Sequence, residues 1–200
     1  MDPQVEQALA KWPNVPHCYG WLALDARGNW RMRDEQAQKQ GRLGERIAHA
    51  ALIAFINRNY TCDAQGRWYF QNGPQRVYVE LEAAPYIARL DSDPCLALHT
   101  GDSLQGLDAV YLSDGGRLWL HGRGKIALLD DRDLAHCLPL LSLDGQAMND
   151  DGLAAWLASR GAAGQLQLNW TRAMPVSHLS EADAANRFGF VRSPSAGRPA

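Results

Sequence analysis

Apolar and polar residues alternate along several short stretches of the chain, which is the pattern of strands with one buried face. The clearest stretch is RVYVELEA, residues 76–83, in which Val77, Val79 and Leu81 point to one side of the predicted strand. Shorter runs of this kind, separated by Gly, Asn and Asp turn signals, predict further strands. They lie near residues 18–24, 30–33, 67–70, 86–90, 95–101, 109–113, 117–122, 125–129 and 165–170.

A helical period appears in fewer places. In GRLGERIAHAALIAFINRNY, residues 41–60, apolar side chains recur at steps of four. They are Leu43, Ile47, Ala51 and Phe55. The stretch therefore predicts one long, largely buried helix. Shorter helices are predicted within residues 1–17, 130–142, 149–161 and 180–189.

These elements follow no regular alternation of strand, helix and strand. Runs of strands surround isolated helices, which indicates an α+β protein with mostly antiparallel pairing. We predict two related subdomains, each a curved, mostly antiparallel sheet packed on a helix. The expected ranges are an N-terminal helix and linker at 1–17, a first subdomain at 18–90, a second subdomain at 91–190 and a flexible tail at 191–200.

A short motif, D-A-x-G-x-W, occurs twice and supports the division into related parts. The copies are Asp25–Trp30 and Asp63–Trp68, and a looser version at Asp114–Trp119 has one extra residue before Trp. In each copy Asp and Gly predict a turn, and the Gly and Trp two positions apart fall on one side of a strand. We expect the glycine to leave room for the tryptophan ring, so that Gly66→Val would crowd Trp68.

The composition is that of an ordinary globular protein, with 46% hydrophobic residues and a formal net charge of −2. No nucleic-acid partner is expected, because such partners are bound through a surplus of Lys and Arg. We see no signal peptide and no apolar stretch that would cross a membrane, so we predict a cytoplasmic bacterial protein with no membrane partner. The four cysteines have no metal-binding spacing and are expected to be reduced thiols: Cys18, Cys62, Cys95 and Cys137.

No motif predicts catalysis or a bound metal. The chain lacks a G-x-S-x-G nucleophile motif, and none of its six His residues pairs with another at the i, i+4 spacing. The stretch HGRGK, residues 121–125, lacks the spacing of a phosphate-binding P-loop and predicts a tight turn. The alternative reading is a turn whose backbone amides hold an anion. We therefore predict no catalytic residues, no metal site and no cofactor.

Seven tryptophans are an unusual number for this length, and two readings of them stay open. They either fill the cores of the sheets or line a cleft for a small ligand. Under the second reading, Trp30 and Trp68 wall a cleft between the two halves. The polar candidates beside them are Arg31, Arg76, Gln71 and Tyr78, together with Arg33 and Arg67. Arginines at such a site suit an anionic ligand; otherwise they lie exposed on an edge strand.

The stretch GRWYFQNGPQRVYVELEAAPYIARL, residues 66–90, resembles a run in the bacterial domain of unknown function 1285 family. The matching positions are Gly66, Trp68, Tyr69, Val77, Val79, Leu81, Ala84, Pro85 and Tyr86, with an upstream match at Gly28 and Trp30. The resemblance covers roughly residues 20–140. It implies two similar α+β halves, a role in signalling or ligand sensing and no established enzyme activity. A sister family that shares only this core motif is the alternative.

We therefore expect a non-catalytic protein that binds a small ligand, anionic if the arginines line the site, or a protein partner, in a regulatory or signalling role. Two alternatives stay open. One is an enzyme of unknown class with its site in the inter-subdomain cleft. The other is a homo-oligomeric interaction module, such as a homodimer.

Overall fold

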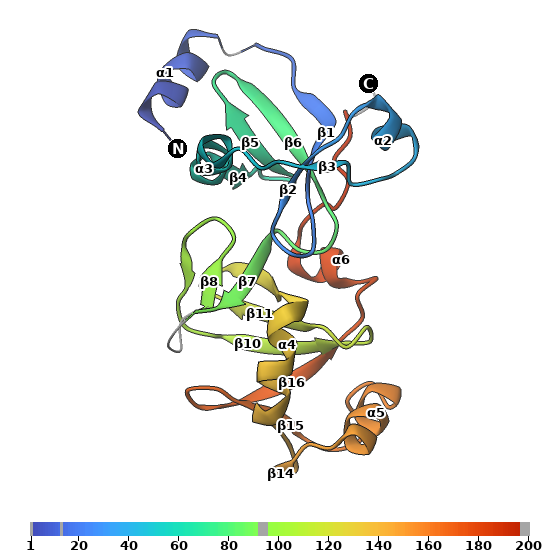
Figure 1. Cartoon of the computed structure of the whole chain (residues 1–200). Helices are drawn as coiled ribbons and strands as arrows, with labels where there is room; N and C mark the ends of the chain where they lie inside the picture. The colour runs from blue at the N-terminus through green and yellow to red at the C-terminus, as the bar shows by residue number, and fades with distance from the viewer. Residues whose placement is uncertain (1, 13, 92–95, 197–200) are drawn as a thin grey trace. The chain divides into compact units, whose positions relative to one another are not determined.

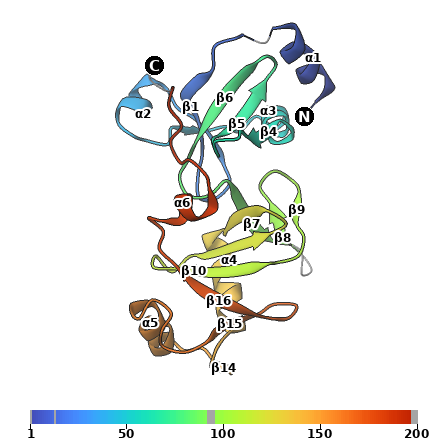
Figure 2. The same cartoon turned by 180° about the vertical axis from the view of Figure 1, so that it is seen from behind.

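The computed structural model describes residues 2–12, 14–91 and 96–196. These divide into two compact units. The first unit consists of the described residues up to Pro85 together with those from Gly189 onward, and the second runs from Tyr86 to Phe188. Each unit has its own sheet with helices beside it (Figure 1, Figure 2). The predicted α+β class with two mostly antiparallel sheets is confirmed.

The sheet of the first unit has six strands in the order β3-β2-β1-β6-β5-β4. Neighbouring strands are antiparallel except β1 and β6, which run parallel. The strands are β1 (Cys18–Leu24), β2 (Trp30–Met32), β3 (Glu45–Arg46), β4 (Tyr60–Cys62), β5 (Trp68–Asn72) and β6 (Gln75–Leu81). The helices are α1 (Pro3–Lys11), α2 (Glu35–Lys39) and α3 (Ala50–Arg58).

The sheet of the second unit has ten strands in the order β14-β13-β15-β16-β10-β11-β12-β7-β8-β9. Parallel pairs are β10 with β16 and β12 with β7. The strands are β7 (Tyr86–Leu90), β8 (Leu96–Leu98), β9 (Ser103–Leu104), β10 (Ala109–Ser113), β11 (Leu118–Gly122), β12 (Lys125–Leu129), β13 (Leu141–Leu143), β14 (Gln146–Ala147), β15 (Leu166–Asn169) and β16 (Ala173–Leu179). The helices are α4 (Asp131–Cys137), a short 3-10 helix (Leu138–Leu140), α5 (Asp150–Ala158) and α6 (Ala184–Phe188).

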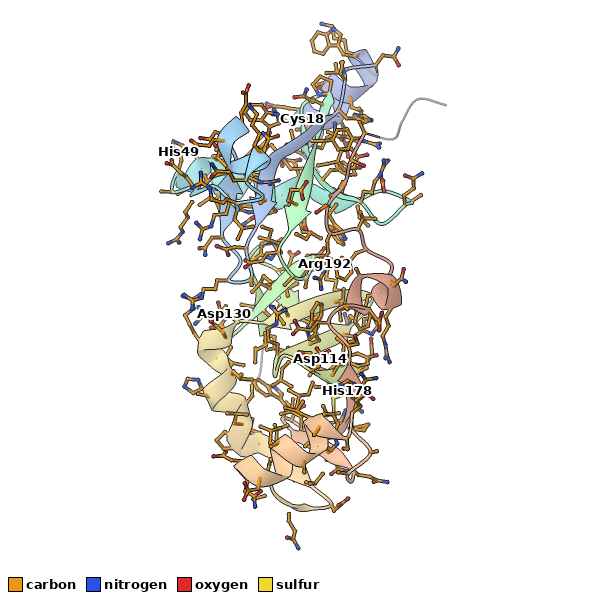
Figure 3. All side chains as sticks on the ribbon, turned by 90° about the vertical axis from the view of Figure 1, so that its right-hand side faces the viewer. Cys18, His49, Asp114, Asp130, His178 and Arg192 are labelled. Carbon is orange, nitrogen blue, oxygen red and sulfur yellow. The ribbon has the colours of Figure 1, made fainter. Side chains whose placement is uncertain are left out.

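Asp130 joins β12 to α4 in the second unit (Figure 3). Its side chain is fully buried and accepts the backbone N–H of Arg132 at 3.0 Å, which caps the helix. The Arg132 guanidinium contacts both carboxylate oxygens, at 2.9 and 2.5 Å. Although burial raises the pKa of Asp130, these hydrogen bonds and the positive charge of Arg132 lower it to about 2. The carboxylate stays charged inside the protein because it is fully paired.

The long helix predicted over residues 41–60 is wrong in its first half. Helix α3 begins only after His49, whose side chain caps its first turn. Residues 45–46 instead form the edge strand β3 against β2. Gly44 requires this path, because its φ is +82° and a Cβ added there would overlap the backbone carbonyl of Met32. The segment therefore runs along the edge of the sheet as a strand, where the sequence pattern predicts a helical turn.

Leu43 and Ile47 consequently share no helical stripe with Phe55. Apolar residues at steps of four are compatible with a helix, but the spacing carries no information about the backbone torsions at the glycines between them. Helix α2, which no pattern predicts, precedes this segment. Its N-cap is Asp34, whose carboxylate accepts the backbone N–H of Ala37 at 2.7 Å.

The boundary between the units falls after Pro85, whereas the sequence places it after residue 90. The reason is that β7 pairs with both β8 and β12 and so belongs to the sheet of the second unit. Of the cysteines, Cys18, Cys62 and Cys137 are free thiols, and Cys95 lies outside the described residues.

The C-terminal segment differs from the predicted flexible tail at 191–200. The backbone N–H of Val191 donates to the carbonyl of Gly66 at 2.9 Å. The carbonyl of Arg192, labelled in Figure 3, accepts the N–H of Leu81 at 2.8 Å. These bonds join the segment to the sheet of the first unit, while residues 197–200 lie outside the described residues.

The two copies of D-A-x-G-x-W form the same turn. In the first, Asp25 N–H donates to the carbonyl of Asn29 at 3.1 Å and Gly28 N–H donates to the carbonyl of Asp25 at 3.0 Å; from Asp63 the second copy repeats both bonds at 3.0 Å. In each, an Asp carboxylate oxygen also accepts the N–H four positions later, at 2.8 Å from Asn29 and 3.0 Å from Arg67. The glycines have φ values of 78° and 74°. This is the type I turn with a left-handed fourth residue that typifies three-residue hairpin loops.

The aspartates of these turns also hold an arginine each. Asp25 Oδ2 accepts from Arg31 Nε at 2.8 Å, and Asp63 Oδ2 accepts from Arg67 Nε at 2.8 Å. Burial raises the pKa of both carboxyls, but hydrogen bonds from the backbone amides and the arginines outweigh it and lower each pKa below the usual 3.8. Each aspartate therefore closes a turn and neutralises a cation on the sheet.

A third turn of this geometry lies in the second unit, one residue earlier than the sequence predicts. It begins at Ser113 rather than Asp114: Ser113 N–H donates to the carbonyl of Arg117 at 2.9 Å, and Ser113 Oγ accepts the Arg117 N–H at 3.0 Å. Counted from Ser113, Leu118 takes the position of the two tryptophans, and Trp119 follows one residue later. A shift of one residue turns a side chain to the opposite face of the sheet.

Because Ser113 has no carboxylate, another residue pairs with the arginine of this turn. Glu181 accepts the Ser113 hydroxyl at 2.6 Å and forms an ion pair with Arg117. In this turn the arginine is thus paired with an acid from a distant part of the chain, whereas each aspartate turn supplies its own acid.

Gly66 is constrained by the C-terminal segment. Its φ is +74°, and a Cβ added there would overlap the carbonyl oxygen of Gly189; the three nearest atoms all belong to Gly189 and Phe190. The expectation that Gly66 makes room for Trp68 is therefore corrected. The space that a side chain at Gly66 would need is occupied by the backbone of the C-terminal segment at Gly189.

Gly66→Ala is expected to destabilise the protein more than Gly41→Ala. Both positions have a left-handed φ, +74° and +63°, and at Gly41 an added Cβ would meet nothing within 4 Å. The left-handed conformation costs an L-residue about 1–2 kcal/mol at either site, so the additional loss at Gly66 measures the overlap with Gly189. Thermal unfolding followed by circular dichroism gives the comparison, with about 2–4 °C in Tm per kcal/mol for a chain of this size. Equal Tm values would contradict the close approach of the C-terminal segment.

Asp63→Asn is expected to lower stability at pH 7 by about 2 kcal/mol, the typical contribution of hydrogen bonds to a charged group. The pKa of Asp63 in the folded protein lies below its usual 3.8. The ionised carboxylate therefore contributes its full stabilisation above the usual pKa of 3.8. This stabilisation is lost as the pH falls through the lowered pKa of the folded protein. Urea unfolding at a series of pH values should show the gap between wild type and Asp63→Asn narrowing below about pH 4.

Glu6→Gln, which removes the same charge from an exposed side chain of α1, is the control and should change stability little at any pH. A gap for Asp63→Asn that stays constant down to pH 3 would show that the ionised carboxylate is not what stabilises the turn.

Candidate functional site

The two repeated tryptophans meet on Tyr60 in the first unit. The Trp30 ring lies edge-on to Tyr60 at 5.1 Å between centroids, and the Trp68 ring lies tilted against it at 4.9 Å. Trp30 is only 2% exposed and its indole N–H donates to Asn57 Oδ1 at 2.7 Å, while Trp68 is half-buried. The two turns thus deliver both rings to one aromatic cluster, and for Trp30 these contacts are those of a core residue.

Arg31 and Gln71 lie on strands that are not neighbours, because β1 and β6 separate β2 from β5. Arg31 is held by Asp25. Gln71 is fully buried, and its side-chain N–H donates to the carbonyl of Gly73 at 2.9 Å. Its carbonyl oxygen has no hydrogen-bond partner among the described residues. These two predicted residues are therefore not brought together.

Tyr78 stands at the centre of a second cluster. Its hydroxyl donates to Asp63 Oδ2 at 3.0 Å and accepts from Arg67 Nη2 at 3.2 Å. Its ring stacks on Tyr19 at 4.6 Å with only 4° between the planes, and it also contacts Tyr69. The second aspartate turn is thereby connected to an aromatic layer on the sheet.

Arg76 and His17 complete this cluster. Arg76 lies over the ring of Tyr69 at 4.8 Å, and the His17 ring lies edge-on to Tyr78 at 5.7 Å. Burial lowers the pKa of His17, and the charges of Arg76 and Arg67 lower it further. Burial, with the hydrogen bond to the nearby carboxylate, raises the pKa of Tyr78. Both rings are therefore uncharged at neutral pH, and the positive charge here belongs to the arginines.

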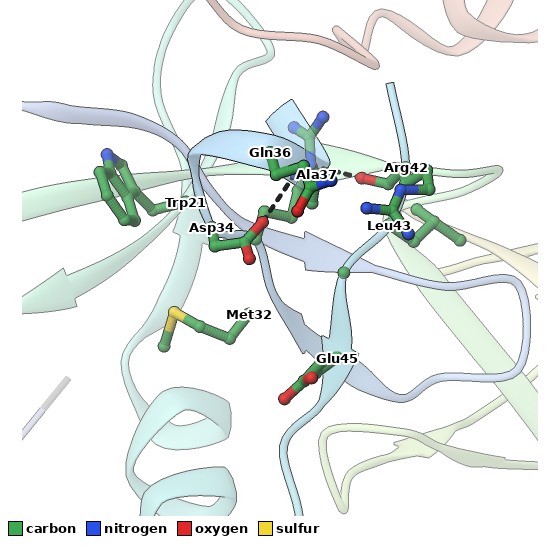
Figure 4. A pocket seen from close by; sticks show the side chains of 10 residues that line it. Trp21, Met32, Asp34, Gln36, Ala37, Arg42, Leu43 and Glu45 are labelled. Atoms are coloured by element: carbon green, nitrogen blue, oxygen red, sulfur yellow. Dashed lines mark hydrogen bonds between the residues drawn. The ribbon is translucent and has the colours of Figure 1, made fainter. Parts of the chain in front are cut away.

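A pocket of about 580 Å³ lies in the first unit beside α2 and β3 (Figure 4). Trp21 and Met32 form part of its wall and are 42% and 48% exposed. Both are large apolar side chains, and together they leave an exposed apolar surface in the wall of one cavity. Leu43 and Ala37 extend this surface.

Four charged side chains line the same pocket, and two of them are already engaged. Arg33 is 8% exposed, donates to the carbonyl of Arg42 at 2.9 Å and lies 3.6 Å from Glu80. Asp34 caps α2. The side chains of Arg42 and Glu45 form no ion pair within 4 Å with any residue that the structure describes. These two groups are available to a ligand.

The sequence named Arg33 among its candidates but missed Trp21, Met32 and Arg42. Trp21 follows Gly20, which has a φ of +80° at an irregularity in the pairing of β1 with β6. That irregularity arises from strand pairing and has no signal in the local alternation. The prediction of a helix over residues 41–60 places Arg42 on that helix and not beside a pocket. The six predicted ligand residues do not line this pocket and remain a prediction: Trp30, Trp68, Arg31, Arg76, Gln71 and Tyr78.

The described residues contain no group of three or more His, Cys, Asp or Glu side chains placed to hold a metal ion. Within the same parts of the chain, no helix is long and apolar enough to cross a membrane.

The fold is similar to that of a solved DUF1285 family protein from Silicibacter pomeroyi DSS-3. The TM-score is 0.50 at 16% identity, over 88% of this chain and 94% of the other. A DUF1285 family protein from Shewanella baltica OS155 gives a TM-score of 0.41 at 17% identity, over 58% of this chain and 88% of the other. The first likeness confirms the predicted resemblance at the level of the fold.

No curated protein matches the chain. A family model, DUF2944, described as "Protein of unknown function (DUF2946)", matches residues 1–195. Since the match spans nearly the whole chain, the protein belongs to this family of unknown function.

Proposed function

We propose that the protein binds a small amphipathic ligand in the pocket beside α2 and β3. The apolar body of the ligand covers Trp21 and Met32, and its anionic group faces Arg42. The observation that carries the proposal is that Trp21 and Met32, although 42% and 48% exposed, line one cavity of about 580 Å³.

Burial of apolar surface supplies the affinity. Each 100 Å² of apolar surface removed from water contributes about 2.5 kcal/mol, and a tryptophan offers a flat face for an aromatic or aliphatic group. The backbone around Trp21 is held by pairing, since the N–H of Arg33 donates to the Trp21 carbonyl at 2.9 Å. The apolar wall is therefore fixed before a ligand arrives.

The charges of the pocket select the sign of the ligand. The Arg33 charge is already balanced by Glu80, at 3.6 Å, which leaves Arg42 as the remaining cation of the lining, opposed by Glu45 and by the Asp34 carboxylate that caps α2. An anionic ligand pairs with Arg42 through the fork of its guanidinium, and Glu45 opposes it. Removing the Arg42 charge should therefore lower the affinity for an anion, and removing the Glu45 charge should raise it.

We extend the proposal to a regulatory or signalling role, in which the protein responds to whether a ligand occupies the pocket. A protein partner is the second candidate, because the exposed Trp21 and Met32 side chains lie beside the short edge strand β3. A second copy of this chain is the simplest such partner.

The test uses 8-anilinonaphthalene-1-sulfonate, a fluorescent amphipathic anion, titrated into the folded protein, with octanoate as competitor. Trp21→Ala is expected to weaken binding by about tenfold, which corresponds to about 1.4 kcal/mol. Trp12→Ala, which removes another exposed tryptophan of the same unit, is the matched control and should leave binding unchanged. Circular dichroism confirms that each variant is folded.

The charge arm compares Arg42→Gln with Glu45→Gln. We expect Arg42→Gln to weaken binding of the dye and Glu45→Gln to strengthen it, each by several-fold, because surface charge pairs contribute about 0.2–1 kcal/mol. Equal binding by wild type and Trp21→Ala would refute the site. Light scattering that shows a dimer for wild type and a monomer for Trp21→Ala would assign the pocket to an interface between copies.

A further inference from the structure

A separate cavity of about 350 Å³ lies in the second unit. Side chains of β10, β11, β12 and α6 line it together with the turn between β11 and β12. The lining residues are Tyr111, His121, Gly124, Ile126, Arg187 and Phe188. They include an arginine and a histidine and no carboxylate, in contrast to the pocket of the first unit.

Arg187 is positioned by aromatic rings and not by an acid. Its guanidinium lies 4.7 Å from the centroid of Tyr111 and 5.9 Å from that of Phe188. It forms no ion pair within 4 Å with any described residue, although Asp183 precedes it by one helical turn. A guanidinium stacked on rings keeps its edge N–H groups free for a carboxylate or phosphate.

Phe188 fixes the platform beneath this cation. It lies nearly parallel to Trp119 at 6.2 Å and 19° and to His121 at 6.4 Å and 17°, and it meets Tyr111 edge-on at 5.3 Å. Trp119 is completely buried. A cation on a ring that is itself packed against the core loses little further freedom when it binds an anion.

The turn in HGRGK contributes a backbone donor to the same cavity. Arg123 and Gly124 have φ values of 48° and 74°, the left-handed pair that a two-residue hairpin turn requires. The N–H of Arg123 donates to Asp108 Oδ2 at 2.8 Å. The N–H of Gly124 donates to no acceptor among the described residues. The turn predicted from the sequence thus leaves one amide available at the cavity lined by Arg187.

We propose that this cavity is a binding site for a small oxyanion, a carboxylate or phosphate group, held by Arg187, His121 and the Gly124 amide. The charge of the lining, the aromatic seat of the arginine and the available amide all favour that chemistry. The inference does not depend on the ligand proposed for the first unit, because no residue is shared between the two cavities.

The test is a ¹H–¹⁵N NMR titration of the full chain at constant ionic strength with inorganic phosphate, benzoate and benzamide. Phosphate and benzoate separate the two anion types, and benzamide is the uncharged counterpart of benzoate. We expect saturable shifts of the Gly124 amide with at least one anion and none with benzamide. Arg187→Gln should weaken the binding by about tenfold, a difference of 1.4 kcal/mol.

Arg160→Gln is the matched control, since it removes the same charge from α5's C-terminal turn in the same unit. It should leave the affinity within about twofold, because Arg160 is exposed and does not line the cavity and salt screens exposed charges. Arg187→Lys, which keeps the charge but loses the planar fork, should fall between wild type and Arg187→Gln. Equal weakening by Arg160→Gln, binding of benzamide as tight as that of benzoate, or no shift of Gly124 with either anion would each overturn the proposal.

Discussion

The hydrogen bond that a backbone N–H donates to the side-chain oxygen of the residue four positions earlier organises much of this structure. Asp25, Asp63 and Ser113 each accept such a bond. In every case the donor directly follows a glycine with a left-handed backbone. The bond sets the length of the hairpin loop, and the loop length sets the register of the two strands that follow. Register in turn decides which side chains face the core. The same small interaction therefore determines the positions of large aromatic rings.

The consequences differ between the aspartate turns and the serine turn. After Asp25 and Asp63 the residue five positions on is a tryptophan, and both rings pack on Tyr60. After Ser113 the tryptophan comes one residue later and lies under Phe188 in the second unit. One repeated turn thus supports a core cluster in one unit and the platform of a cavity in the other.

The two cavities proposed as binding sites differ in their chemistry. The pocket beside α2 combines exposed apolar side chains with opposed charges, which suits an amphipathic ligand. The cavity around Arg187 has a cation on aromatic rings and no acid in its lining, which suits an oxyanion. Neither depends on an unusual residue type. The first arises where successive elements between Trp21 and Glu45 meet, and the second arises where α6 packs on strands far from it in the chain.

The sequence by itself determined the α+β class, most strands, the two aspartate turns and the tight turn at 121–125, because period-two alternation and Asp-Gly turn chemistry act over a few residues. It failed over 41–60, where Gly44 must pass the backbone of Met32, and at Gly66, where the returning chain occupies the space of a Cβ. Tertiary structure alone decided these points and the composition of both pockets. Close approach between segments far apart in the chain, such as Gly66 and Gly189, leaves no local pattern to be read.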